Sequence, residues 1–119
     1  MQILRAIAAA LIALTGPALA DPAEIVGTTA RATGAGWQFD VTIAHGDTGW
    51  EDYADGWRVE LADGTILGTR ILVHPHVEEQ PFTRSLREVA IPEGVSEVHI
   101  RASTNVTGWA TTRRALMLN

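Results

Sequence analysis

Apolar and polar side chains alternate along most of the chain beyond residue 24, and turn signals interrupt the alternation at short intervals. The clearest run is residues 37–43, where Trp, Phe, Val and Ile take the odd positions and Gln, Asp and Thr take the even ones. Strict alternation of this kind indicates a β-strand with one buried face. Residues 57–61 repeat the pattern, and the following Asp63-Gly64 predicts a hairpin turn that leads into a returning strand.

The whole pattern predicts seven strands, over residues 25–33, 37–43, 57–61, 66–73, 82–91, 95–100 and 109–118. Strands at such regular spacing, with few long connections, are typical of an antiparallel sandwich of the immunoglobulin or fibronectin type III kind. Trp57 lies on the third strand, where these folds place a core Trp. We expect Trp37, Trp57 and Trp109 all to lie in the core. The sequence therefore predicts an all-β fold.

Residues 1–20 have the features of a secretion signal. Arg5 precedes an apolar run over residues 6–15, and Ala18-Leu19-Ala20 is a small-residue cleavage signal. The run is shorter than the ~20 residues of a membrane-spanning helix, and no Cys follows it to carry a lipid. We therefore expect cleavage after Ala20, a single domain over residues 21–119, a periplasmic or secreted location, and no membrane anchoring of the mature chain.

Charge and composition exclude several classes of function. The chain has 14 acidic residues against nine basic ones, all of them Arg, and the loss of Arg5 with the signal leaves six net negative charges. Nucleic acids and anionic membranes require basic footprints, so neither is an expected partner. The absence of Cys excludes disulfides and thiol chemistry. The three Ser residues lie outside any nucleophile motif and no glycine-rich phosphate loop is present, so we do not expect an enzyme.

Two long connections, residues 45–55 and 74–81, break the pattern of tight turns. In an antiparallel arrangement, the connections after the second, fourth and sixth strands lie at the same end of the sandwich. The third of these connections is residues 105–108. Binding residues concentrate on loops that a rigid scaffold holds, so this end is where we expect the functional site.

The shared end would bring together His45, His74 and His76, with Asp47 and Asp52 on the first connection. Imidazole is the commonest metal ligand, and carboxylates complete many metal sites. One hypothesis is therefore a Cu²⁺ or Zn²⁺ site formed by these five residues. The alternative is that the His side chains bond loop backbone groups or the nearby carboxylates, and bind no metal.

The same loops also carry groups suited to a metal-free recognition surface. Trp50 and Tyr53 could form a stacking platform for a sugar or a partner side chain, with Glu79 on the facing loop. They could equally plug the open end of the core. Thr48 and Glu51 have the spacing of a capping box, which predicts a short helical turn that occupies Glu51. The alternative to a metal-binding protein is thus a protein- or ligand-binding module that uses this loop surface.

Two motifs carry a resemblance that covers most of the mature chain. They are the run from His45 through Trp50 to Asp55, and the run His74-Pro-His76 followed by Glu79-Gln-Pro-Phe82. Together they resemble an uncharacterised family of small secreted or periplasmic proteobacterial proteins. The resemblance implies no activity. It implies that relatives often have His at the position of Asp52, so a site with four His ligands would be incomplete in this chain.

Overall fold

The computed structural model describes residues 20–119, so the predicted signal peptide lies outside the described residues except for Ala20. The described part contains eight strands. They are β1 (Glu24–Thr33), β2 (Gly36–Ala44), β3 (Ala54–Glu60), β4 (Ile66–Ile71), β5 (Phe82–Val89), β6 (Glu97–Thr104), β7 (Gly108–Trp109) and β8 (Arg114–Met117).

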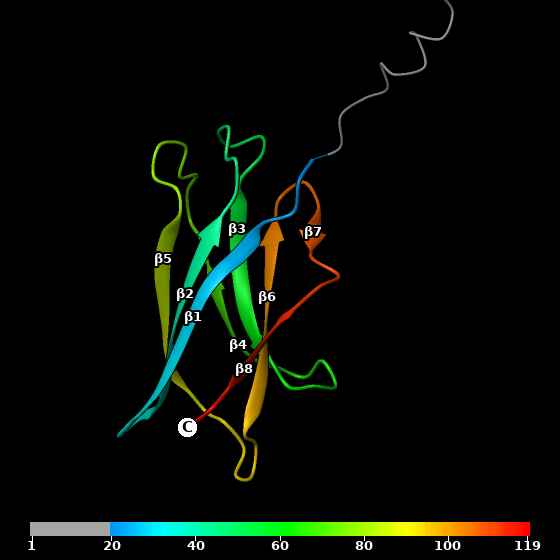
Figure 1. Cartoon of the computed structure of the whole chain (residues 1–119). Coiled ribbons are helices and arrows are strands. Elements are labelled where there is room, and N and C mark those ends of the chain that lie inside the picture. Colours follow the sequence, from blue (N-terminus) through cyan, green and yellow to red (C-terminus); the bar gives the residue numbers. More distant parts are fainter. Residues whose placement is uncertain (1–19) are drawn as a thin grey trace, which may run out of the picture.

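The strands form two antiparallel sheets that pack face to face (Figure 1). One sheet has the order β1-β2-β5, and the other has the order β4-β3-β6-β7, with β8 also paired to β6. Placing the first, second and fifth strands in one sheet and the third, sixth and last in the other is the arrangement of immunoglobulin-like sandwiches. The predicted all-β antiparallel sandwich is therefore confirmed, whereas the predicted number of seven strands is wrong.

The difference lies in the predicted last strand, 109–118, which is divided into β7 and β8. Both strands pair with β6, and the Ala110 N–H still donates to the Ala102 carbonyl, but residues 111–113 leave the ladder. Within this link, the Arg113 guanidinium donates to the Glu60 carboxylate and to the Leu61 and Ala62 carbonyls. Contacts between residues about fifty positions apart thus interrupt a strand that local alternation predicts to be continuous.

The core fills the space between the sheets with the inward-facing side chains predicted by the alternation. Its fully buried members include Phe39, Val41, Trp57, Val59 and Ile100. Trp37 is partly buried and packs against this core. The prediction for Trp109 is wrong: its side chain is 38% exposed and lies on the outer face under the Arg58 guanidinium, 4.1 Å from the ring centre. Trp109 lies close to Gly56 there: a Cβ at position 56 would be in ordinary contact with its ring, at 3.6 Å, and tighter against the Arg70 carbonyl oxygen, at 3.3 Å.

A carboxylate on the outer face of the second sheet is buried by arginines. Glu60 is 0% exposed, and its oxygens accept hydrogen bonds from Arg58 at 2.6 Å, Arg101 at 2.8 and 3.0 Å, and Arg113 at 3.1 Å. These bonds, above all those from Arg101, lower the pKa of Glu60 from 4.5 to about 2. This cluster ties β3, β6 and the β7–β8 link together.

The β2–β3, β4–β5 and β6–β7 connections lie at one end of the sandwich, at the top of Figure 1. Hydrogen bonds join all three: the Asp47 carboxylate accepts from the His76 backbone, and the Asn105 side chain donates to the Trp50 carbonyl. The prediction that these three connections lie at the same end of the sandwich is confirmed. Below, this region is called the loop end, and it comprises residues 45–53, 72–81 and 105–107. Among the residues that the structure describes, no helix is long and apolar enough to cross a membrane.

Candidate functional site

Asp47 is the central residue of the loop end. Its side chain is fully buried, and its carboxylate accepts three hydrogen bonds. Oδ1 accepts from the Ala54 backbone at 3.1 Å and lies 2.6 Å from Nδ1 of His45, while Oδ2 accepts from the His76 backbone at 2.8 Å. A buried carboxylate requires such partners to offset its desolvation. Asp47 therefore joins the β2–β3 connection to the β4–β5 connection through their main chains.

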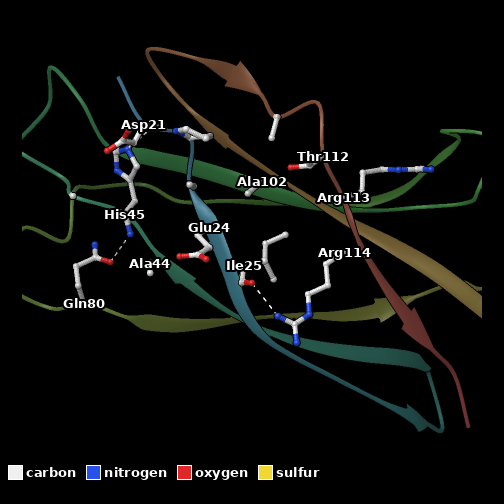
Figure 2. A pocket seen from close by; sticks show the side chains of 14 residues that line it. Asp21, Glu24, Ile25, Ala44, His45, Gln80, Ala102, Thr112, Arg113 and Arg114 are labelled. Atoms are coloured by element: carbon white, nitrogen blue, oxygen red, sulfur yellow. Dashed lines mark hydrogen bonds between the residues drawn. The ribbon is translucent and has the colours of Figure 1, made fainter. Parts of the chain in front are cut away.

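Both ring nitrogens of His45 face protein oxygens. Nδ1 contacts Asp47, and Nε2 lies 3.0 Å from the Asp21 carbonyl oxygen, which belongs to the segment before β1 (Figure 2). The His45 backbone N–H donates to Oε1 of Gln80 at 2.9 Å. His45 is only 8% exposed. The ring thus has no nitrogen available for a metal unless one of these contacts breaks.

His45 also lies in the wall of a cleft of about 830 Å³ at the open edge of the sandwich. Figure 2 shows this cleft between the start of β1 and the 110–114 segment, with small side chains such as Ala44 and Ala102 among its lining residues. Arg114 donates to the Ile25 carbonyl at 3.0 Å and so bridges the two sheets at this edge.

His76 is held by packing and by one arginine. Its ring stacks on Phe82 with a centroid distance of 3.9 Å, and Nε2 lies 2.9 Å from the Arg84 guanidinium, which can only donate. Burial is the main cause that lowers the pKa of His76, and the positive charges of Arg84 and His74 act in the same direction. Nδ1 is buried without a hydrogen-bond partner among the described residues. His76 is therefore a neutral ring with Nε2 occupied.

His74 and Glu79 lie on the outside of the same connection. The His74 ring is exposed and 4.6 Å from the His76 ring centre, and its Nδ1 lies 3.0 Å from the Pro75 carbonyl oxygen. The Glu79 side chain is 65% exposed, 3.4 Å from Arg84 and 3.9 Å from His76. Within residues 20–119, no group of three or more His, Cys, Asp or Glu side chains is placed to hold a metal ion.

Asp52 belongs to a tight turn over residues 49–52. The Thr48 N–H donates to the Asp52 carbonyl at 3.0 Å, and the Asp52 N–H donates to the Gly49 carbonyl at 3.2 Å. The capping-box prediction is therefore wrong: the Thr48 hydroxyl does reach Glu51, at 3.2 Å, but the backbone forms no helical turn. Oδ1 of Asp52 is buried, 3.6 Å from Nε2 of His45, and has no hydrogen-bond partner among the described residues.

Trp50 projects from this turn into solvent and is 64% exposed. Its ring meets the half-buried Tyr53 edge-on, with centroids 5.4 Å apart and planes at 76°. Two hydrogen bonds from Asn105 fix the backbone beneath it: Nδ2 donates to the Trp50 carbonyl at 2.9 Å, and Oδ1 accepts from the Tyr53 N–H at 2.8 Å. Trp50 does not plug the core, and the two rings do not form a flat platform.

The loop end combines exposed apolar side chains with acidic ones. Val77 on the β4–β5 connection is 53% exposed, and Val106 beside Asn105 is 51% exposed. Glu51, Glu78 and Glu79 on the same loops are exposed. Recognition surfaces generally contain both apolar and polar side chains, with aromatic residues enriched.

Sequence reasoning missed several residues that organise this end. Asp21 contributes only its carbonyl, and Gln80 links the His45 N–H to the His76 carbonyl through its side-chain amide. Sequence reasoning also assigned no role to Asn105 or Arg84. Strand parity places Asn105 at the loop end, so its position could be predicted from the sequence. The contact of Arg84 with His76 depends on side-chain packing and could not.

Comparisons with known proteins give one informative similarity. No family model matches the chain, and no solved structure matches it. The chain is similar to a protein of Halomicrobium mukohataei named "Putative lipoprotein", with 39% identity over 88 residues that make up 73% of this chain and 43% of that protein. The chain thus spans less than half the length of this relative. The resemblance to a proteobacterial family stays a prediction.

Proposed function

We propose that this protein is a metal-free recognition module that works outside the cytoplasm and binds a partner protein or ligand through its loop end. The observation that carries this proposal is Trp50, which is exposed while both hydrogen bonds of Asn105 hold its backbone in place. A large aromatic ring presented on a fixed backbone loses little conformational entropy on binding, which is why Trp is enriched among the residues that dominate interface energies.

The partners of the buried residues favour a metal-free site over the Cu²⁺ or Zn²⁺ hypothesis. Metal binding at His45 would require its ring to leave Asp47 or the Asp21 carbonyl, and binding at Nε2 of His76 would require Arg84 to leave. Each buried group left unpaired costs about 1–3 kcal/mol. The competing hypothesis retains the neighbouring His74 and His76 rings, with Asp47, Asp52 and His45 as further ligands after rearrangement.

The proposed location is the periplasm or the exterior. The predicted signal over residues 1–20 supports it, and the lipoprotein name of the archaeal relative is consistent with it. That name also refers to membrane attachment of the relative. The present chain contains no Cys to carry a lipid, so we propose that it acts unanchored. We further propose a binding role without catalysis.

A photocrosslinking residue in place of Val106, which is 51% exposed on the loop end, tests the recognition surface and leaves Trp50 in place. We expect adducts of discrete mass with a partner from the extracytoplasmic fraction of the source organism. The same crosslinker in place of Met117, which is similarly exposed at 57% but lies at the opposite end, should give none. Trp50→Ala should leave the free energy of unfolding within about 0.5 kcal/mol of the wild type. Equal adducts from both positions, or adducts from neither, would contradict the proposal.

Metal titration separates the two hypotheses. We expect the melting temperature to stay constant as Zn²⁺ or Cu²⁺ is added, because both ring nitrogens of His45, Nε2 of His76 and the Asp47 carboxylate already contact protein groups. The double variant His74→Ala, His76→Ala should lower the stability of the metal-free protein, since the His76 ring packs on Phe82. His99→Ala, on β6, is the matched control for losing a His elsewhere.

The metal hypothesis predicts the opposite behaviour. A protein that binds metal only when folded gains about 2.7 kcal/mol at a metal concentration 100 times the dissociation constant. A rise in melting temperature that the double variant abolishes, while its metal-free stability stays unchanged, would replace the metal-free proposal by a metal-binding one.

A further inference from the structure

Strand β4 is an edge of its sheet, and its outer side has no strand beside it within the described part of the chain. The hydrogen bonds to β3 show which groups point outward. The Leu72 N–H donates to the Asp55 carbonyl, and Arg70 stands opposite Trp57 in the same register. In an antiparallel ladder, alternate residues face the partner strand. The N–H and C=O groups of Thr69 and Ile71 therefore point to the open edge, and the Leu72 bond carries the same alternation past the end of β4 toward residue 73.

The side chains of these same three residues lie together on the outer face of the sheet. Arg70 points inward, where its guanidinium donates to the Ser85 carbonyl at 3.0 Å, so its neighbours Thr69 and Ile71 point outward. Ile71 is 61% exposed and Val73 is 71% exposed. All three outward residues are β-branched, the type that packs best on a pleated surface. An exposed apolar edge of this kind is a template for strand pairing.

Other edges carry features that oppose such pairing. At the β1 edge, the Ile25 carbonyl is already bonded to Arg114. Strand β5 carries Arg84 and Arg87 and ends near Glu88, a non-glycine residue with a φ of 57°. Natural sheets use charges and irregular backbone to keep edges from pairing. Between residues 69 and 73 the only charged side chain of β4 is Arg70, which is turned inward.

We propose that the outer edge of β4 pairs antiparallel with the β4 edge of a second copy of this chain, about a two-fold axis at Ile71. An antiparallel two-fold axis places one residue opposite itself, and Ile71, whose N–H and C=O face the edge, would form a hydrogen-bonded pair there. This register puts Thr69 opposite Val73 of the other copy. The outer face then gains a continuous cluster of six β-branched side chains, and cross-strand pairs of this type are stabilising.

The register also explains how copies of an acidic protein can associate. The mature chain carries six more negative than positive charges, which disfavours contact between copies in general. At this edge, however, no charged residue stands opposite a like charge, because Arg70 stands opposite Leu72. Two-fold pairing is the commonest symmetry of homo-oligomers. The paired residues 69–73 include the first two residues of the loop-end segment 72–81 but not Trp50, and the association does not rest on the proposed recognition function.

Analytical ultracentrifugation of the mature protein tests the association. We expect a concentration-dependent dimer, with Ile71→Lys raising the dissociation constant at least about tenfold, because two Lys side chains would then face each other. Ile71→Pro removes an outward N–H at an edge position, where strands tolerate Pro, and should act in the same way. Met117→Lys is the control for an exposed apolar residue elsewhere. A monomer at all concentrations, or a dimer that both Ile71 variants leave unchanged, would overturn the proposal.

The absence of Cys in the chain allows a second, direct test of the register. Single Cys variants at positions 69, 71 and 73 are oxidised, and the covalent dimer is measured. Residues opposite each other in a ladder have Cα atoms about 5.5 Å apart, within the 4.4–6.8 Å that a disulfide spans. We expect the highest yield at position 71. Equal yields at all three positions and at a Met117→Cys control would show random collision and contradict the proposed axis.

Discussion

Replacing Asp47 with Asn is expected to lower the free energy of unfolding by about 2–4 kcal/mol, because each buried donor left without its acceptor costs about 1–3 kcal/mol. The carboxylate is fully buried and accepts hydrogen bonds from the backbones of Ala54 and His76 as well as contacting His45. An amide has a single acceptor oxygen. Its NH₂ group would point a donor at another donor, which leaves at least one buried N–H unpaired.

Urea unfolding of Asp47→Asn and wild-type protein measures this loss. Asp52→Asn is the matched control: Asp52 lies on the same connection, but its side chain is 26% exposed and its Oδ1 bonds no donor. We expect the control to cost less than about 1 kcal/mol. Equal losses for the two variants would show that Asp47 does not organise the loop end in the way that its contacts indicate.

The second large effect is expected at Glu60. Glu60→Gln should lower the free energy of unfolding by about 2–4 kcal/mol, because three guanidinium groups lose their common anion. The value is placed below the range for fully buried pairs, since the arginine side chains are about one-fifth exposed and solvent screens them. Urea unfolding at pH 7 measures it, and a loss below about 0.5 kcal/mol would contradict it.

Acid unfolding gives an independent readout of Glu60. Its pKa is lowered from 4.5 in the unfolded chain to about 2 in the folded protein. A lowered carboxylate pKa stabilises the folded state fully above the unfolded value, and this stabilisation disappears as the pH falls through the folded value. At 1.36 kcal/mol per pH unit, the contribution is about 3 kcal/mol.

The wild type should therefore lose stability relative to Glu60→Gln between pH 4.5 and pH 2, until the two proteins differ little. Free energies of unfolding measured along this range check the effect. Glu93→Gln, at an exposed turn, is the control and should follow the wild type. A constant difference between wild type and Glu60→Gln across the window would contradict the assigned role.

Alternation and turn residues were sufficient to predict the fold because they report which face of each strand is buried. Residues 37–43 and 57–61 alternate clearly, and they form the middle of the two sheets. The end of the chain was mispredicted for a physical reason. The bonds of Arg113 to Glu60 and to nearby carbonyls hold residues 111–113 out of the ladder, and the Arg58 guanidinium covers Trp109 outside the core. Local alternation contains no information on such distant contacts.

The sequence predicted where the loop end lies, but it did not predict the contacts that the residues of the loop end make. Strand parity placed His45, His76 and Asp47 at one end, and the structure joins them through the Asp47 carboxylate. The partners that occupy the imidazole nitrogens are the Asp21 carbonyl and Arg84. Every residue has a backbone carbonyl, so the sequence does not indicate which carbonyl will bond a ring nitrogen. Which group an arginine side chain contacts depends on how the folded chain packs.

Amide hydrogen exchange of the metal-free protein tests most directly whether the loop end is fixed without a metal. The Ala54 and His76 N–H groups donate to Asp47, and the Tyr53 N–H donates to Asn105. We expect these three amides to exchange slowly in the absence of metal, Ala54 and His76 nearly as slowly as the core amide of Val59, with rates that Zn²⁺ does not change. Rapid exchange without metal, followed by at least about tenfold protection on addition of Zn²⁺, would contradict a preorganised metal-free recognition surface.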